Sequence, residues 1–190
     1  MKINHDDIEE VLISADEIDA RLDVLAREID VHYEENAQSD GELVLVGILT
    51  GATIVMSDFS RKLETSSVID WMSLSSYGSG TKSSGVVRVL KDLSTDIKGK
   101  NVLIVEDIID SGVTLQWVVN DLKTRGAKSV EVVSLLNKQL NDSVSQKSRI
   151  VARWVGFNIP DKFVVGYGLD YAGKYRTLPY IGVLKSEVYS

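Results

Sequence analysis

The chain has 190 residues, the length of one ordinary domain, and its 44% hydrophobic and 26% charged residues exclude a disordered or fibrous protein. It contains no cysteine, which excludes disulfide frameworks, thiolate metal sites and a thiol nucleophile. With only two histidines, a histidine metal triad or a Ser-His-Asp hydrolase is not expected. The net charge of −7 argues against nucleic-acid binding, which depends on Lys and Arg side chains that neutralise phosphates.

The N-terminal segment lacks the basic start and the apolar run of a signal peptide. No stretch approaches the roughly 18–20 apolar residues that a bilayer span needs. We therefore expect a cytoplasmic protein without a membrane partner.

The N-terminal part of the chain predicts an extended piece and a helix. Apolar residues around Ile8–Ile13 precede Ser14-x-x-Glu17, which has the spacing of a capping box at a helix start. Behind it, apolar residues recur every three or four positions, as on one face of an amphipathic helix that fades near Glu35–Ala37. The residues of this face are Ile18, Leu22, Leu25, Ala26 and Ile29.

Short apolar runs alternate with helical stretches in the middle of the chain. The runs are Leu43–Leu49, Val102–Val105 and Val130–Leu136. A helical stretch to about Leu63 follows the first run, and a helix over about Val113–Thr124 follows the second. Runs that are buried on both faces and alternate with helices indicate a parallel sheet covered by helices. We therefore predict a single α/β domain over residues 1–190.

Two segments do not fit this alternation. Residues 73–85 are rich in Ser and Gly and too long for an ordinary turn, so they form either a floppy connection or a lid. From about Val155 onward, aromatic residues and glycines predict turns and short strands. This part is expected to form a small hood beside the sheet.

The segment Val102–Thr114 carries the clearest chemical signal. Its apolar strand brings Glu106 and Asp107 to the carboxyl end of a sheet, where ligands bind in open α/β folds. Adjacent carboxylates suit ribose hydroxyls or a hydrated Mg²⁺. Asp110 then begins a Ser/Gly/Thr loop that opens a helix, and its clustered N–H groups suit a phosphate. The same residues also fit a simple helix cap at Asp110 or Ser111, or the acidic pocket of a phospho-acceptor signalling domain.

Taken together, this segment resembles the phosphoribosyl pyrophosphate motif of type I phosphoribosyltransferases. Its form over Val105–Gly112 is similar to that of the 6-oxopurine branch, the hypoxanthine-guanine phosphoribosyltransferases. Ser75–Gly78 resembles the mobile catalytic loop of that branch, Leu135–Lys138 its purine-reading strand, and Val155–Tyr171 its C-terminal signature. The resemblance extends from about Ile8 to Ile181.

The resemblance implies a fold and a reaction. The fold has a mostly parallel central sheet flanked by helices, with a core over about residues 37–154 and a hood from about 1–20 and 155–190. The reaction transfers the 5-phosphoribosyl group from phosphoribosyl pyrophosphate to hypoxanthine or guanine, giving IMP or GMP and pyrophosphate. Mg²⁺ as the cofactor and a homodimer or homotetramer as the assembly are implied in the same way.

The resemblance also assigns roles at the ribose and phosphate end. Glu106 and Asp107 hold the ribose hydroxyls and, with Asp170, help to organise Mg²⁺. Asp110 is the general base near purine N7. The loop that wraps the 5′-phosphate, mainly through backbone N–H groups, is Asp110, Ser111, Gly112, Val113 and Thr114.

At the purine end, the resemblance implies that Lys138 donates to O6 and so rejects adenine. Phe163 stacks on the base, and the backbone of Val164 meets its Watson–Crick edge. Asp170 contacts the guanine amino group, and Arg176 binds pyrophosphate. Taken alone, the lysine would be a surface residue, the phenylalanine a core residue and the arginine an exposed residue at a turn.

Two loops complete the implied site. Ser76 and Tyr77 belong to the mobile catalytic loop that closes over the substrates. The pyrophosphate loop reads Leu49-Thr50-Gly51, where many family members have Leu-Lys-Gly. The lysine side chain is absent here, but much of that loop's contact comes from backbone amides in an unusual, often cis, peptide.

Several alternatives stay open at this point. The polar stretch Gln139–Arg153 looks longer than the usual connection, which leaves the outer wall of the purine pocket undefined. A relative that prefers xanthine or a pyrimidine base, or a regulator that senses phosphoribosyl pyrophosphate and binds nucleic acid, would share much of this pattern. The sequence does not choose between hypoxanthine and guanine.

Overall fold

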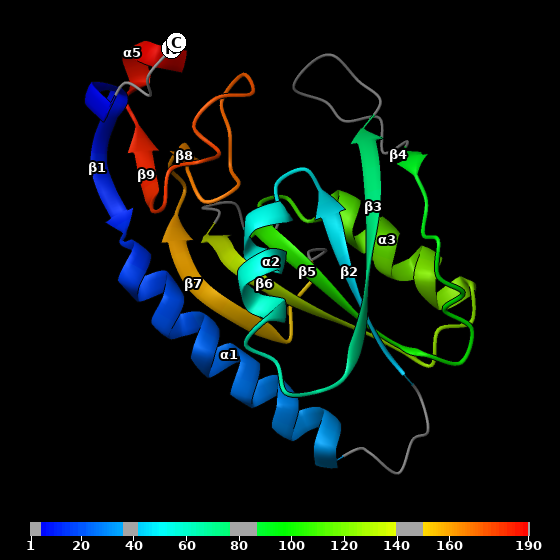
Figure 1. Cartoon of the computed structure of the whole chain (residues 1–190). Helices are drawn as coiled ribbons and strands as arrows, with labels where there is room; N and C mark the ends of the chain where they lie inside the picture. Colours follow the sequence, from blue (N-terminus) through cyan, green and yellow to red (C-terminus); the bar gives the residue numbers. More distant parts are fainter. Residues whose placement is uncertain (1–4, 36–41, 77–86, 140–149, 190) are drawn as a thin grey trace.

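The computed structural model describes residues 5–35, 42–76, 87–139 and 150–189. Its centre is a six-stranded sheet of order β4-β3-β2-β5-β6-β7, parallel except for the β3–β4 pair (Figure 1). This arrangement confirms the predicted α/β class with a mostly parallel sheet. The strands are β2 (Leu43–Leu49), β3 (Ser67–Ser76), β4 (Val87–Lys91), β5 (Asn101–Ile109), β6 (Ser129–Gln139) and β7 (Trp154–Pro160).

Helices cover both faces of this sheet. α1 (Ala15–Glu35) and α2 (Thr53–Ser60) pack on one face, and α3 (Val113–Thr124) packs on the other (Figure 1). Successive strand residues point to opposite faces, so in β2 Leu45 joins the core under α1 and α2, whereas Val46 joins the core under α3. Both faces of the strand are buried, which explains its continuous apolar sequence.

The predicted capping box opens α1. The Ser14 N–H donates to Glu17 Oε2 over 2.8 Å, and the Glu17 N–H donates to Ser14 Oγ over 3.3 Å. The predicted apolar face of the helix is confirmed, since each of its members is at most 1% exposed. These residues are Ile18, Leu22, Leu25, Ala26 and Ile29.

The hood is a small antiparallel sheet that joins the two ends of the chain. Its strands lie in the order β1 (Ile8–Ile13), β9 (Ile181–Leu184) and β8 (Val164–Val165). The short helices η1 (His5–Asp7) and α5 (Ser186–Tyr189) lie at its outer end (Figure 1). The hood therefore stands above one end of the large sheet.

The predicted hood boundary at residue 155 is wrong. Residues up to Pro160 lie in β7, which pairs in parallel with β6 and forms an edge of the large sheet. Buried Trp154 and Ile159 anchor this strand in the main core. The glycine and aromatic residues of this region did not predict a strand of the large sheet. The strand forms because it pairs with β6, a partner that the local sequence pattern does not reveal.

Two other predicted boundaries also differ. α2 ends at Ser60 rather than near Leu63, with Arg61 as its C-cap residue. Lys62, beyond the helix, forms ion pairs with Asp19 at 2.6 Å and Asp23 at 2.7 Å. The Ser-rich stretch that begins at residue 73 is not all loop, since residues 73–76 are the last part of β3 and pair with β4. A cluster of serines and glycines is typical of a loop, so only the partner strand reveals this extension.

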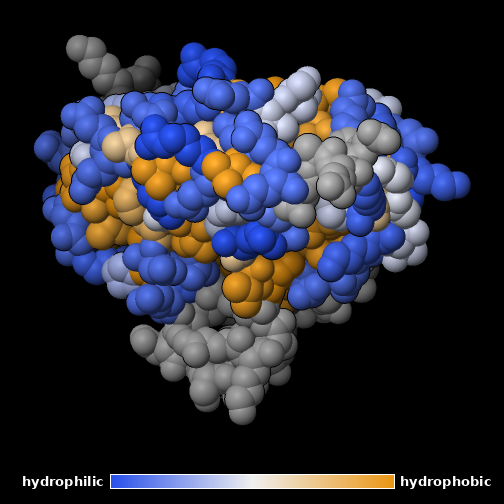
Figure 2. Space-filling view, turned by 90° about the horizontal axis from the view of Figure 1, so that it is seen from below, coloured by the Kyte–Doolittle hydropathy of each residue, from blue (hydrophilic) through white to orange (hydrophobic). Residues whose placement is uncertain are grey.

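The molecular surface combines hydrophobic and hydrophilic areas. In the view from below, hydrophobic areas lie among hydrophilic residues (Figure 2). Among the residues that the structure describes, no helix combines the length and the apolar character needed to cross a membrane. The large hydrophobic side chains that are exposed are Val11, Val24, Val31, Ile69, Leu90, Val113, Val151, Phe163 and Tyr189.

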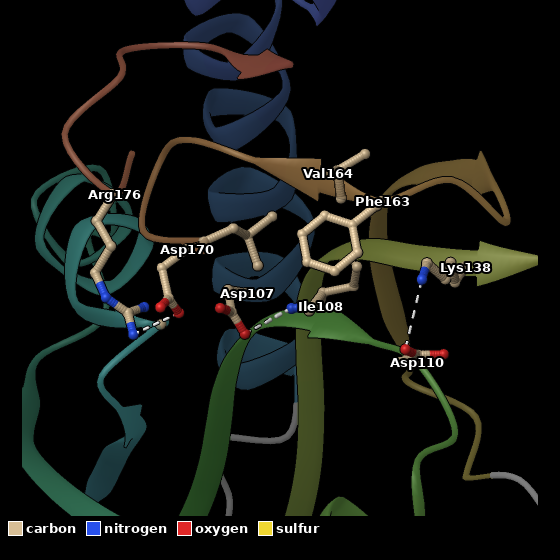
Figure 3. A pocket seen from close by; sticks show the side chains of 10 residues that line it. Asp107, Ile108, Asp110, Lys138, Phe163, Val164, Asp170 and Arg176 are labelled. Atoms are coloured by element: carbon tan, nitrogen blue, oxygen red, sulfur yellow. Dashed lines mark hydrogen bonds and ion pairs between the residues drawn. The ribbon is translucent and has the colours of Figure 1, made fainter. Parts of the chain in front are cut away.

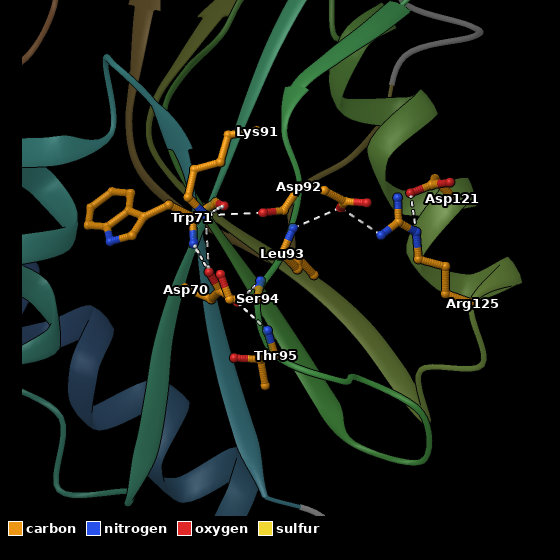
Figure 4. Close-up of polar contacts among 9 residues, drawn as sticks. All are labelled: Asp70, Trp71, Lys91, Asp92, Leu93, Ser94, Thr95, Asp121 and Arg125. Carbon is orange, nitrogen blue, oxygen red and sulfur yellow. Dashed lines mark hydrogen bonds and ion pairs between the residues drawn. The ribbon is translucent and has the colours of Figure 1, made fainter.

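A buried carboxylate, Asp70 of β3, organises the chain between β4 and β5 (Figure 4). It accepts hydrogen bonds of 2.7 Å from the backbone N–H groups of Trp71, Ser94 and Thr95, and it lies 3.5 Å from Lys91 Nζ. Burial alone would raise the pKa of Asp70, but these donors outweigh it and hold the pKa at about 2.

The same segment is tied to α3 from its other side. Arg125, at the end of α3, forms ion pairs with Asp92 at 2.7 Å and with Asp121 at 2.8 Å (Figure 4). Asp70 is the buried member of this network, so it should contribute most to stability.

We predict that Asp70→Asn destabilises the fold by about 2 kcal/mol at neutral pH, because the folded-state pKa lies below the ordinary value of 3.8. The stabilisation from the ionised carboxylate is present above about pH 4 and is lost as the pH falls toward about 2. Urea unfolding at neutral pH and at about pH 3 measures both effects. Glu34→Gln, on the exposed end of α1, is the matched control. Equal urea midpoints for Asp70→Asn and the wild type at neutral pH would contradict the prediction.

Candidate active site

A pocket of about 340 Å³ lies between the carboxyl ends of the central strands and the hood (Figure 3). Such volumes are typical of small-molecule sites. The ion pairs Lys138–Asp110 and Arg176–Asp170 lie at its two ends, and Phe163 lies between them (Figure 3). The residues that line it are Gly51, Asp107, Ile108, Asp110, Lys138, Phe163, Val164, Leu169, Asp170 and Arg176.

A second, smaller hollow of about 170 Å³ adjoins this pocket at the N-terminus of α3. It shares Ile108 and Asp110 with the larger pocket. The residues that line it are Glu106, Ile108, Ile109, Asp110, Ser111, Gly112, Thr114 and Leu115. Most of the predicted site residues of β5, α3 and the loop between them are therefore brought together around two adjoining spaces.

The acidic pair lies within β5 rather than in a turn after it. The strand continues past the predicted end at Val105, and Glu106 pairs with Ser134 of β6. Glu106 Oε2 is buried and has no hydrogen-bond partner among the described residues. Burial and the neighbouring Asp107 carboxylate raise the pKa of Glu106 well above its ordinary value. A buried carboxylate oxygen without a donor is costly unless a ligand supplies one.

Asp107 faces the larger pocket. Its Oδ1 accepts the Ile108 N–H over 2.8 Å. Burial raises the pKa of Asp107 to about 6, although that hydrogen bond and the Arg176 guanidinium act in the opposite direction. The Asp170 carboxylate adds to the rise. The side chain is therefore poised to gain from a nearby cation or hydroxyl donor.

The loop before α3 does not use the predicted side-chain cap. Gly112 is the N-cap residue, with φ of 74°, and makes no side-chain capping hydrogen bond. This left-handed conformation favours glycine. The helix-cap interpretation of Asp110 and Ser111 is therefore wrong, and their loop lies at the N-terminus of α3, where anions bind.

Lys138 is not a surface lysine. Its side chain is only 14% exposed, and Nζ lies 3.5 Å from Asp110 Oδ2 and 3.3 Å from Asp161 Oδ1. Phe163 and Val164 lie above it in the pocket wall (Figure 3). Asp161, which the sequence analysis did not identify, therefore belongs to the surroundings of this lysine.

The other end of the pocket holds a compact ion pair. Arg176 Nη2 lies 2.6 Å from Asp170 Oδ1, and Arg176 Nη1 donates to the Gly168 carbonyl over 2.5 Å. Asp170 Oδ2 accepts the Gly173 N–H over 2.7 Å. Arg176 is therefore fixed in the pocket wall rather than free in solvent.

The loop Leu49-Thr50-Gly51 packs tightly against both halves of the site. Its Leu49–Thr50 peptide is cis. A Cβ atom on Gly51 would collide with the Asp107 carboxylate, and one on Gly168 would collide with the Gly51 carbonyl. The backbone of Gly51 therefore fills the space between β5 and the hood, and no side chain fits at either glycine.

Some predicted site residues do not line these spaces. Leu49 and Thr50 adjoin Gly51 without lining either one, Val113 is the exposed first residue of α3, and Ser76 ends β3. Tyr77 and residues 78–86 of the predicted lid lie outside the described residues, as do residues 140–149 of the polar stretch.

Three residues near the pocket were missed by the sequence analysis. Ile108 lies inside the recognised motif, and Leu169 and Asp161 lie inside the C-terminal signature. Ile108 and Leu169 are apolar and read as core, so only their place in the pocket wall identifies them. Asp161 could have been identified from its position two residues before Phe163.

Comparisons with known proteins agree with this geometry. The phosphoribosyl transferase domain matches residues 14–172. The hypoxanthine-guanine phosphoribosyltransferase of Bacillus subtilis is 46% identical over 183 residues, which cover 96% of this chain and 97% of that protein. The bifunctional protein TilS/HprT of Listeria innocua is 49% identical over 186 residues, but this chain spans only 27% of its length.

Comparison of the fold with solved structures indicates the same family. The crystal structure of a hypoxanthine phosphoribosyltransferase from Staphylococcus aureus superposes with a TM-score of 0.89 and 44% sequence identity. The match covers 98% of this chain and 96% of that one. The predicted resemblance is confirmed, and the chain belongs to the phosphoribosyltransferase family, with the type I fold of its hypoxanthine-guanine branch.

Proposed function

We propose that the protein is a purine salvage enzyme that transfers the 5-phosphoribosyl group from phosphoribosyl pyrophosphate to N9 of hypoxanthine or guanine. The products are IMP or GMP and pyrophosphate. The observation that carries the proposal is a single pocket with a lysine–carboxylate pair at one end, an arginine–carboxylate pair at the other and the Asp107 carboxylate between them. We also propose a cytoplasmic homodimer or homotetramer with only small-molecule substrates.

The smaller hollow suits the 5′-phosphate. Gly112 lets the backbone turn directly into α3, so the N–H groups of this turn face the hollow at the positive end of the helix dipole. Ser111 and Thr114 add hydroxyl groups to the lining. A phosphate bound here would place the attached ribose toward β5.

The acids of β5 suit the ribose. Glu106 Oε2 lacks a donor within the described protein, and a ribose hydroxyl would supply one. In the transition state of such a transfer, positive charge grows on the ribose as the bond to pyrophosphate breaks. The half-buried carboxylates of Glu106 and Asp107, once ionised, would stabilise that charge more strongly than water does.

The pocket also fits a magnesium ion carried by the substrate. No group of three or more potential metal-ligating side chains occurs among the described residues. Mg²⁺ commonly takes only one or two carboxylates and fills its other positions with substrate phosphates and water. Asp107 and Asp170 would hold it, with Glu106 nearby. When bound, the ion would neutralise charge on the leaving pyrophosphate.

The lysine–carboxylate pair suits one edge of a 6-oxopurine. O6 and N7 are neighbours on that edge, so Lys138 can donate to O6 while Asp110 holds or accepts the proton at N7. Phe163 would stack on the base, and the backbone of Val164 would meet its opposite edge. Adenine carries an amino group at position 6, which cannot accept from Lys138.

Nucleotide formation with five separate bases tests the function and the alternatives. Phosphoribosyl pyrophosphate and Mg²⁺ are incubated with hypoxanthine, guanine, xanthine, adenine or uracil. We expect IMP and GMP, and much less product with adenine and uracil. Formation of the xanthine or uracil nucleotide alone would support a relative of different preference. Binding of phosphoribosyl pyrophosphate without any product would support a regulator.

Lys138→Ala should weaken purine binding and reduce discrimination against adenine. A hydrogen bond to a charged group contributes about 1.5–3 kcal/mol, so we expect a rise of roughly 10–100-fold in KM for the base. Steady-state kinetics with both substrates varied measure this effect. Lys128→Ala removes an exposed lysine just before β6 and is the control. An unchanged base KM for Lys138→Ala would rule out its role in recognition.

Asp110→Asn should lower kcat rather than raise the KM for the base, because the proposed role of Asp110 is proton transfer at N7. General acid–base groups contribute roughly 10²–10⁴-fold, so kcat should fall by that order. The KM for phosphoribosyl pyrophosphate should change little, since the backbone N–H groups of the phosphate loop remain. A wild-type kcat would remove Asp110 from the chemistry.

Gly51→Ala should disrupt the pyrophosphate side of the pocket, because the added methyl group collides with the Asp107 carboxylate. Displacement of the Gly51 backbone or of the Asp107 carboxylate should lower kcat/KM for phosphoribosyl pyrophosphate by about 100-fold. Gly99→Ala is the control, since no atom lies near the missing Cβ of Gly99, whose positive φ of 73° makes the substitution a test of backbone strain alone. That variant should lose stability and keep wild-type kinetics. Wild-type kinetics for Gly51→Ala would show that the tight packing is not required.

A further inference from the structure

We propose that Tyr189, next to the last residue of the chain, is a positioning residue for the purine base. It stacks on the side of Phe163 that faces away from the pocket and holds that ring in the orientation that receives the base. The inference rests on the proposed function, in which Phe163 stacks on hypoxanthine or guanine.

The rings of Tyr189, Phe163 and Tyr171 form one aromatic cluster. The Phe163 and Tyr189 rings are stacked, with centroids 4.7 Å apart and planes inclined by 21°. Tyr171 meets Phe163 edge to face, with centroids 5.7 Å apart and planes inclined by 87°. Stacked and edge-to-face pairs at these distances are attractive. Phe163 is therefore held from two directions.

The second face of Phe163 is the one available to a ligand. A phenyl ring has two faces, and Tyr189 covers one of them. Phe163 lines the larger pocket, whereas neither Tyr189 nor Tyr171 is among the described residues that line it. Tyr189 therefore supports the ring from behind and leaves its pocket face to the base.

This support matters because Phe163 is not a core residue. Its side chain is 36% exposed, and it directly precedes the two-residue strand β8. Without Tyr189 the ring would lose a stacked neighbour and gain rotational freedom. Base binding would then have to restrict a mobile ring, which lowers affinity.

The C-terminal helix brings Tyr189 to this place. The Leu184 N–H donates to the Phe163 carbonyl over 2.9 Å, which ties the end of β9 to the residue before β8. α5 then turns back, and Val188 packs into the small hood cluster with Val165 and Leu178. The backbone therefore fixes the distance between Tyr189 and Phe163.

Binding of two ligands tests the proposal. GMP contains the base, whereas phosphoribosyl pyrophosphate with Mg²⁺ does not, so calorimetric titration of both separates base positioning from general damage. We expect Tyr189→Ala to weaken GMP binding by about threefold to tenfold and to leave phosphoribosyl pyrophosphate binding within about twofold. Tyr189→Phe keeps the stacked ring and should bind GMP like the wild type. Glu187→Ala, on the exposed side of α5, is the control.

A double-mutant cycle identifies the route of the effect. If Tyr189 acts through Phe163, Tyr189→Ala should cause no further loss of GMP binding in a Phe163→Ala background. Unchanged GMP binding in Tyr189→Ala, equal losses for both ligands, loss in Tyr189→Phe, or additive losses in the cycle would each overturn the proposal. If the wild type bound phosphoribosyl pyrophosphate but not GMP, that result would contradict the proposed function as well. The wild-type titration therefore distinguishes this outcome from a failure of the Tyr189 proposal alone.

Discussion

Two half-buried carboxylates on one strand, Glu106 and Asp107, impose the main electrostatic constraint on the site. Burial raises the pKa of both, and Glu106 Oε2 has no donor among the described residues. A buried carboxylate oxygen without a donor is costly to a fold, so Glu106 Oε2 points to a ligand that supplies one. A ribose that becomes cationic and a magnesium-bound leaving group would supply the missing partners.

The rest of the site is arranged around these acids by close packing of backbone. Gly51 lies against Asp107 on one side, and Gly168 of the hood lies against Gly51 on the other. A hydrogen bond of 2.5 Å from the Tyr167 hydroxyl to Asp58 ties the hood to α2, the helix that follows this loop. The loop is thus positioned by its neighbours.

The hood contributes one half of the pocket, and residues from both ends of the chain form it. β1 pairs with β9, and β9 pairs with β8, so the short strand after Phe163 is stabilised by N-terminal and C-terminal residues together. Lys138 from β6 meets Asp161 and Asp110 below this strand. The proposed base-recognition residues are therefore brought together by the packing of the hood on the large sheet.

Local patterns predicted much of this arrangement. The Ser14–Glu17 capping box, the helix over Val113–Thr124 and the strand–loop–helix motif with Asp110 each depend on residues close together in sequence. Their physical causes are hydrogen bonds within a few residues and regular burial, which a sequence displays directly.

Features that depend on distant partners could not be predicted in this way. The strand character of Ser73–Ser76 and of β7 comes from pairing with other strands. The bond from Tyr167 to Asp58 joins residues 109 positions apart, and nothing local to Tyr189 indicates its stacking on Phe163. The burial of Lys138 likewise appears only once β6, β7 and the hood are assembled.

The most direct test of the account is a crystal structure of the protein with GMP. We expect the 5′-phosphate against the backbone N–H groups of residues 110–114, the ribose hydroxyls on Glu106 and Asp107, and guanine O6 on Lys138. The base should lie against the pocket face of Phe163. GMP bound in the reverse direction, with its base beside Arg176, or bound outside this pocket would contradict the account.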